Sequence, residues 1–161
     1  MILIDTREQK YSHISEYFDA HGVKYDRSKL YVGDYTLSTD QRICIDRKHN
    51  MAEVYGNVIQ QHERFRNELI RGRDGGHQII VLVEDPRITK LDEVESWKNP
   101  RFFAWMKSRG RIPKPADSET VMKIMQRMEE RYSVEWRFCR KEETARTILD
   151  ILGERYEEGQ S

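Results

Sequence analysis

The feature that most constrains the fold is an uninterrupted apolar run at residues 79–83, with the sequence Ile-Ile-Val-Leu-Val. A half-exposed strand alternates apolar and polar residues, whereas a strand covered on both faces reads as a continuous run of this kind. Segments with the helical spacing of apolar residues lie before and after it. The sequence therefore predicts an α/β fold whose central sheet is covered by helices.

Strand-like and helix-like segments alternate along the chain. We expect strands at Met1–Thr6, Val23–Leu30, Asp34–Leu37, Arg42–Asp46, His77–Glu84 and Val134–Cys139. We expect helices at Tyr11–His21, Met51 to about Arg71, Leu91–Trp97, Asp117 or Ser118 to about Tyr132, and Glu142–Tyr156. The helix from Met51 is the longest of these, and residues 98–114 are expected to form a loop.

Length and composition predict a single soluble domain. A chain of 161 residues can bury one continuous core, so residues 1–161 are expected to form one domain. No apolar run approaches the roughly 20 residues that cross a bilayer, and the N-terminus lacks the basic region of a signal peptide. Cys44 and Cys139 lie in apolar runs, which favours buried thiols in a reducing compartment. We expect a cytoplasmic protein that is neither secreted nor bound to a membrane.

Three acidic residues lie at the ends of strand-like runs within the first 50 residues. They are Asp5, Asp34 and Asp46, and Lys48 follows two residues after the last. Because residues i and i+2 of a strand share one face, Asp46 and Lys48 can act on one site. Carboxylates bind hard cations such as Mg²⁺, and a lysine stabilises the negative charge that grows during phosphodiester hydrolysis. Each motif alone also fits a turn or a solvated ion pair, but their conjunction favours a metal-dependent nuclease site.

In these motifs the chain resembles the nuclease domain of XPF/Hef-type structure-specific endonucleases, which belong to the PD-(D/E)XK superfamily. The motifs are Asp-Thr-Arg-Glu at 5–8, Gly-Asp-Tyr at 33–35 and Asp-Arg-Lys at 46–48. The family usually has Glu-Arg-Lys in the third motif. It also has an aspartate four residues beyond the lysine, where this chain has Ala52 followed by Glu53. Whether Glu53 replaces that aspartate stays open.

The resemblance implies a restriction-endonuclease-like core, with a mixed central sheet flanked by helices on both faces. Residues 1–85 would form the metal-site core, 86–116 a basic and aromatic loop region, and 117–161 a C-terminal helix–strand–helix. Small forms of this kind that lack a helix–hairpin–helix module resemble bacterial or phage proteins.

The resemblance also implies a role for each matching residue in the acidic cluster. Asp34 and Asp46 would bind Mg²⁺ or Mn²⁺, and Asp5 and Glu8 would complete the cluster directly or through water. Lys48 would stabilise the attacking hydroxide or the developing charge on the phosphorane.

Residues in three places are expected to contact DNA. They are Arg7 and Arg47 in the motifs, Gln60, Gln61 and Arg64 on the polar face of the long helix, and Arg101, Trp105, Lys107, Arg109 and Arg111 in the 98–114 segment. That segment has six cations and no acidic residue, although the formal net charge of the chain is zero. Cations bind phosphates, and aromatic side chains stack on unpaired bases. The alternatives are a solvated helix face and a loop whose aromatic residues belong to the core.

We therefore expect a Mg²⁺- or Mn²⁺-dependent DNA endonuclease that acts on branched, forked or flapped DNA. The alternative is a catalytically inactive pseudo-nuclease that serves as a DNA-binding or scaffolding subunit, and the alanine at position 52 favours it. The chain shows no helix–hairpin–helix module. Substrate choice would then depend on a homodimer formed through the C-terminal region, on the 98–114 segment or on a separate DNA-targeting partner.

Overall fold

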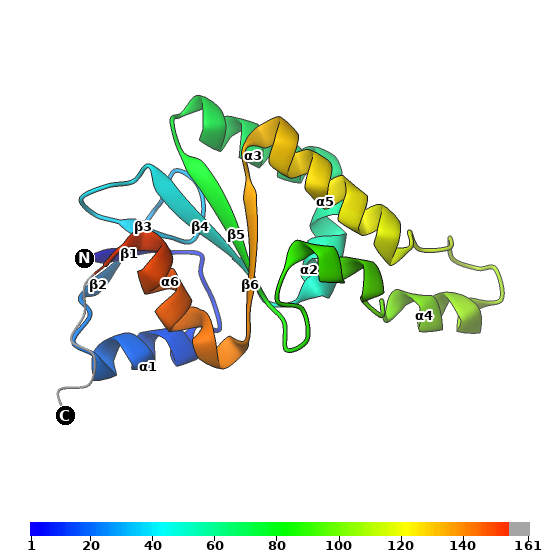
Figure 1. Ribbon diagram of the computed structural model, residues 1–161, viewed down its shortest axis with the longest axis horizontal. Helices are drawn as coiled ribbons and strands as arrows, with labels where there is room; N and C mark the ends of the chain where they lie inside the picture. Colours follow the sequence, from blue (N-terminus) through cyan, green and yellow to red (C-terminus); the bar gives the residue numbers. More distant parts are fainter. Residues whose placement is uncertain (155–161) are drawn as a thin grey trace.

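A computed structural model describes residues 1–154, which form a six-stranded sheet with helices on both faces (Figure 1). The strands are β1 (Ile2–Asp5), β2 (Tyr25–Ser28), β3 (Tyr35–Leu37), β4 (Ile43–Lys48), β5 (Gln78–Glu84) and β6 (Glu135–Cys139), in the order β2-β1-β3-β4-β5-β6. β3 pairs antiparallel with β1 and β4, and the other neighbours pair in parallel. The predicted mixed sheet is therefore confirmed.

The helices divide into two layers, one on each face of the sheet. They are α1 (Ser12–Ala20), α2 (Met51–Tyr55), the π-helix η1 (Gly56–Gln60), α3 (His62–Asp74), the 3-10 helix η2 (Leu91–Ser96), α4 (Arg101–Ser108), α5 (Ser118–Tyr132), the 3-10 helix η3 (Lys141–Glu143) and α6 (Thr144–Leu152). One buried cluster joins α1 and α6 to the sheet, and the other joins α2, η1, α3, η2 and α5 to its opposite face. α4 lies away from the sheet (Figure 1).

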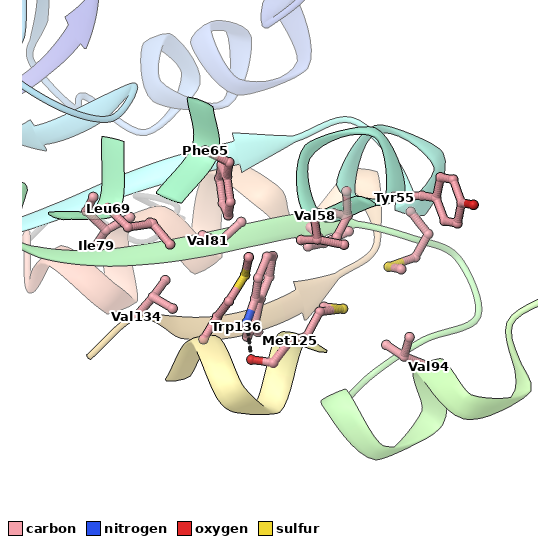
Figure 2. Packing of buried hydrophobic residues seen from close by; sticks show 14 of the residues in the cluster. Tyr55, Val58, Phe65, Leu69, Ile79, Val81, Val94, Met125, Val134 and Trp136 are labelled. Carbon is pink, nitrogen blue, oxygen red and sulfur yellow. Dashed lines mark hydrogen bonds between the residues drawn. The ribbon is translucent and has the colours of Figure 1, made fainter. Parts of the chain in front are cut away.

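The apolar run at 79–83 forms the centre of β5 and serves both buried clusters. Val81 and Val83 belong to the cluster under α3 and α5, whereas Leu82 belongs to the cluster under α1 and α6. Figure 2 shows Val81 between the helices of the first cluster, close to Trp136 of β6. The indole N–H of Trp136 donates a hydrogen bond of 3.0 Å to the backbone carbonyl of Met125, which fixes α5 against β6.

The prediction of one continuous helix from Met51 to Arg71 is wrong. Its path is divided into α2, η1 and α3, and the backbone N–H of Gln61 donates to the carbonyl of Gly56, five residues back, at 2.8 Å. This π-type hydrogen bond inserts a wide turn, which no periodicity of apolar residues reveals. His62, expected on the apolar face, is exposed. π-turns within helices occur frequently beside functional sites.

The prediction that residues 98–114 form a loop is also wrong, because they contain α4. The Asn99 side chain accepts a hydrogen bond of 3.0 Å from the backbone N–H of Arg101 at the start of this helix. Arg109, with φ of 51°, ends the helix in the left-handed conformation. None of its residues is buried, so the apolar stripe that normally identifies a helix has no core to face.

The C-terminal region matches its predicted elements closely. Asp117 caps α5, since its side chain accepts a hydrogen bond of 2.8 Å from the backbone N–H of Thr120. The final helix, predicted to extend to Tyr156, is described from Thr144 to Leu152, and residues 155–161 lie outside the described part of the chain. No helix within residues 1–154 has both the length and the apolar character that crossing a membrane requires.

The apolar residues that favoured a dimer are used within the protomer itself. Val121, Met125 and Met128 of α5 and Ile148 and Leu149 of α6 are buried in the two clusters. Dimerisation through this region therefore stays a prediction, without support from an exposed apolar surplus on these stripes.

Candidate functional site

An acidic cleft of about 460 Å³ opens where β1 and β4 end and β3 begins. Its lining brings together residues from β1, β4, α2, α3 and the loops between them: Asp5, Arg7, Glu8, Gln9, Lys10, Gly33, Asp34, Asp46, Arg47, Lys48, His49, Glu53 and Glu68. All five residues predicted for the acidic cluster are among them. The sheet topology thus assembles motifs that lie up to about 40 positions apart, as expected for strand ends on one edge.

Asp34 is held in the cleft by its backbone and by the glycine before it. Gly33 has φ of 77°, and a Cβ there would lie 3.0 Å from the carbonyl oxygen of Ile45. Only glycine fits this position without strain. One carboxylate oxygen of Asp34 accepts a hydrogen bond of 2.8 Å from the backbone N–H of Arg47. Burial and the nearby charges of Asp46 and Glu8 nevertheless raise the pKa of Asp34 well above its usual value.

Asp46 and Lys48 share one face of β4, as the strand spacing predicts. The Lys48 ammonium lies 3.2 Å from Oδ2 of Asp46 and 5.2 Å from the centre of the Phe65 ring on α3. Burial would lower the pKa of Lys48, but the charge of Asp46, followed by that of Glu53 and others, outweighs it and raises the pKa. Lys48 is therefore a permanent cation at neutral pH and not a general base.

Glu68 of α3 lines the same cleft, and sequence reasoning missed it. Burial and the charge of Asp46 raise the pKa of Glu68, while the charge of Lys48 lowers it. The available signal was spacing, because Glu68 lies four residues after Arg64 on the polar helix face. Its carboxylate adds a third acidic group on the side of the cleft facing β4.

Asp5 uses both carboxylate oxygens to shape the rim of the cleft. Oδ1 accepts a hydrogen bond of 2.9 Å from the backbone N–H of Leu30, and Oδ2 accepts bonds of 3.1 and 2.8 Å from the backbone and Nε of Arg7. Burial would raise the pKa of Asp5, but these hydrogen bonds lower it. Asp5 is therefore a positioning residue, and the Arg7 side chain, 69% exposed, remains open to solvent at the mouth.

Arg47 is buried in a network that leaves it no open face. Its guanidinium donates to Glu8 at 2.9 Å, to Glu84 and to the carbonyl of Gln9 at 2.8 Å, and its side chain is 1% exposed. The structure therefore does not support the predicted phosphate contact. Because Arg47 and Glu84 face α1 and α6, opposite to Asp46 and Lys48, Arg47 supports the strand from behind.

Glu53 lies at the start of α2, where it serves the helix end. Its carboxylate accepts a hydrogen bond of 2.8 Å from the backbone N–H of His49, and its own N–H donates to the side chain of Asn50 at 2.8 Å. It is exposed and lines the cleft. Its position beside Lys48 leaves open whether it replaces the family aspartate.

The three predicted contacts on the long helix lie outside the cleft. Gln60, Gln61 and Arg64 line a separate shallow hollow of about 530 Å³ together with Asn67. The π-turn at η1 ends at Gln60, so the polar face is divided there. These residues remain predicted DNA contacts, at a distance from the acidic cluster along the α3 surface.

The cations of the 98–114 segment differ in how they are used. Lys107, Arg109 and Arg111 are exposed, whereas Arg101 stacks 4.5 Å above the Tyr55 ring and donates to the carbonyl of Ala52 at 3.4 Å. Arg101 thus holds α4 to α2. Lys107, Arg109 and Arg111 are the cations of this segment that a phosphate can reach directly.

The aromatic residues of α4 also divide into covered and open side chains. Trp105 is half-buried, with Phe102 packed edge-on against it and the Lys114 ammonium 5.4 Å from its ring. Phe103 is 63% exposed and Met106 is 59% exposed on the same helix. The open aromatic side chain of α4 is therefore Phe103 and not the predicted Trp105.

The donor set of the cleft fits a hard divalent cation. Asp34, Asp46 and Glu68 supply only oxygen, and the raised pKa values of Asp34 and Glu68 reflect charge repulsion that a cation relieves. Within residues 1–154 no three His, Cys, Asp or Glu side chains already converge on one point. Magnesium commonly uses one or two carboxylates and completes its shell with water and substrate phosphate. Asp34 and Asp46 are sufficient for that arrangement.

Comparison with known proteins gives one family and two similar structures. Residues 4–151 match the model of the ERCC4 domain, and no curated protein matches the sequence. The fold is similar to that of XPF from Aeropyrum pernix, with a TM-score of 0.63 and 18% identity over 95% of this chain and 65% of that one. XPF from Aeropyrum pernix in complex with DNA gives a TM-score of 0.61 and 18% identity, over 94% and 62%. The chain thus spans only part of either XPF chain, and the predicted fold class is confirmed.

Proposed function

Because the chain belongs to the ERCC4 domain family, we propose that it is a divalent-metal-dependent endonuclease that hydrolyses phosphodiester bonds in branched, forked or flapped DNA. One observation carries this proposal: Asp34 and Asp46 line one cleft, with the Lys48 ammonium 3.2 Å from Asp46. The similar XPF structure in complex with DNA supports DNA as the substrate. A cytoplasmic location and a homodimer belong to the same proposal.

Each residue of the cleft has a distinct part in the proposed mechanism. Asp34 and Asp46 hold Mg²⁺ or Mn²⁺, which when bound polarises the scissile phosphate and acidifies a water molecule. Lys48 stays protonated, so its charge stabilises the negative charge that grows on the phosphate in the transition state. Arg7, open at the mouth, binds a phosphate beside the scissile one.

Cleavage assays with matched variants test this proposal. Labelled flap, fork, four-way-junction and linear duplex DNA are incubated with the protein in Mg²⁺, Mn²⁺ or EDTA. We expect metal-dependent cutting of the branched substrates, and its loss in Asp34→Asn and Asp46→Asn, which remove charge and keep shape. Asp40→Asn makes the same charge change in an exposed pair with Arg42, outside the cleft, and should cut at the wild-type rate. Cutting in EDTA, or full activity in either cleft variant, would overturn the assignment.

The pseudo-nuclease alternative has one specific observation in its favour. The position where the family has an aspartate is Ala52, and within the described residues no third ligand has converged beside Asp34 and Asp46. Under this alternative, the protein binds branched DNA but cuts none of the substrates in either metal. Titration calorimetry with Mn²⁺ then separates the two functions, because an inactive subunit has no need to bind the ion.

A further inference from the structure

A second groove lies between α3 and α5, which pack side by side on one face of the sheet (Figure 1). We call it the α3–α5 groove; it has a volume of about 410 Å³, and its lining is Val58, Ile59, His62, Arg66, Ile124, Arg127, Met128, Arg131 and Tyr132. None of these residues lines the acidic cleft. Arg66 and Glu68 are two positions apart on α3, roughly 200° around the helix. The body of α3 therefore separates the groove from the catalytic cleft.

The rim of the groove is cationic and lacks compensating acids. Arg66, Arg127 and Arg131 are exposed, and no acidic residue is part of the lining. Within residues 1–154, none of these three guanidinium groups forms an ion pair with a carboxylate, although Lys123 on the same face of α5 pairs with Glu119 at 3.0 Å. Like charges four residues apart, as at 127 and 131, destabilise a helix. An anionic ligand would remove that cost.

The floor of the groove is apolar, which limits the kind of anion that fits. Val58 and Met128 are buried at 2% and 7% exposure, and Ile59, Ile124 and Tyr132 are half-buried around them. A DNA backbone can pair with the rim but places no apolar group against this floor. An acidic peptide with large apolar side chains satisfies both, because guanidinium groups bind carboxylates in pairs of hydrogen bonds and the floor removes apolar surface from water.

We propose that the α3–α5 groove binds an acidic peptide segment of another protein, with one or two large apolar side chains seated between Arg66 of α3 and Arg127 and Arg131 of α5. The far end of the groove is already fixed for this purpose, since Arg73 of α3 donates a hydrogen bond of 3.2 Å to the carbonyl of Arg131. Because the groove and the cleft lie on different sides of α3, a bound partner leaves the acidic cleft open to DNA. The site goes beyond the proposed nuclease function and does not depend on it.

Fluorescence anisotropy with a defined probe tests the site. The probe is a labelled peptide, Asp-Glu-Asp-Leu-Phe-Glu-Asp, and two control peptides replace either Leu-Phe by Ser-Ser or the acids by their amides. We expect saturable binding of the probe, weakened by rising salt, and much weaker binding of both controls. Replacing Arg127 and Arg131 together by glutamine should weaken binding by about tenfold for each guanidinium removed.

A matched control and a competing ligand make the test decisive. Arg87→Gln makes the same charge change on an exposed side chain that lines neither the groove nor the cleft, so it should leave binding of the probe unchanged. Thermal melts of all variants verify the fold. The proposal is overturned if the probe does not bind, if Arg87→Gln weakens binding as much as the double variant, or if the Ser-Ser peptide binds equally well. It is also overturned if duplex DNA, and not the probe, loses affinity in the double variant, because the groove is then a DNA track.

Discussion

At the scale of single residues, the cleft separates groups that hold charge from groups that hold shape. Asp34, Asp46 and Lys48 have little to do with the folding of their loops, whereas Asp5 and Arg47 spend their polar atoms on the backbone around the cleft. Lys48 is the clearest case, since its ammonium is a cation inside a set of carboxylates. Its contribution should therefore appear in the transition state and not in the binding of the ion.

Lys48→Ala is accordingly expected to lower the single-turnover cleavage rate by about two to three orders of magnitude, as loss of one preorganised charge does. Mn²⁺ binding should persist and even strengthen, because the cation that repels the ion is gone. Single-turnover kinetics and calorimetry measure the two effects separately. If Lys48→Ala cuts at the wild-type rate, Lys48 is only the partner of Asp46.

Glu68 gives a prediction with opposite signs for stability and activity. Its pKa in the folded protein lies above the ordinary value of 4.5, so folding favours the protonated form and the charge lowers stability at neutral pH. Glu68→Gln should raise Tm at pH 7 in EDTA, by about 2–4 °C for each kcal/mol gained. The gain should vanish as the pH falls below 4.5, because the wild-type carboxyl is then also neutral.

The matched control for this effect is Glu63→Gln on the same helix, where the side chain is exposed. It should leave Tm within about 1 °C, as most surface substitutions do. Cleavage should fall in Glu68→Gln alone if the carboxylate belongs to the site. A lower Tm in Glu68→Gln would mean that the carboxylate makes a favourable contact in the folded protein.

At the scale of elements, the sequence predicted what periodicity can encode. All six strands were placed within three residues of their ends, and the face shared by Asp46 and Lys48 followed from the strand period alone. The π-turn at η1 was missed because its signature is a backbone hydrogen bond and not a pattern of apolar residues. α4 was missed because a helix without buried residues has no apolar stripe that faces a core. Glu68 was missed because its role depends on how α3 docks over β4.

α4 carries the prediction that belongs to this scale. Arg109 and Arg111 follow the helix, are exposed and have no carboxylate partner among residues 1–154. Replacing both by alanine should weaken DNA binding and flatten the salt dependence of affinity by up to about two, or roughly one for each phosphate contact. Cleavage at saturating enzyme should survive, because neither residue lines the acidic cleft. An unchanged salt slope would place the DNA path on another face.

At the scale of the whole molecule, a buried polar network ties the strand of the cleft to the opposite helical layer. Glu84 of β5 accepts hydrogen bonds from Arg47, from His13 of α1 at 2.7 Å and from Thr144 of α6 at 2.7 Å. The Cys139 thiol also lies near it. The network therefore holds β4, α1 and α6 in one arrangement, which fixes the backbone that presents Asp46 and Lys48 on the other face.

The protonation of Glu84 should consequently govern how the protein unfolds in acid. Burial would raise the pKa of Glu84, but the hydrogen bond from Thr144 and the charge of Arg47 outweigh it and hold the pKa below its ordinary value of 4.5. A carboxyl with a lowered folded pKa contributes its full stability above the unfolded pKa and loses it as the pH falls through the folded one. Glu84→Gln keeps the shape but leaves Arg47 short of one charge, which costs about 3 kcal/mol at pH 7.

Chemical denaturation of wild type and Glu84→Gln between pH 3 and 8 measures this difference in unfolding free energy. We expect a constant difference from about pH 6 to 8 and its decline below 4.5. A decline centred near pH 6.5 would instead assign the effect to His13, because that is where histidine titrates. Glu130→Gln, an exposed carboxylate of α5, should show almost no difference at any pH. The cleavage rate of Glu84→Gln should fall together with the order of β4, since the network holds Asp46 in place from behind and touches no substrate.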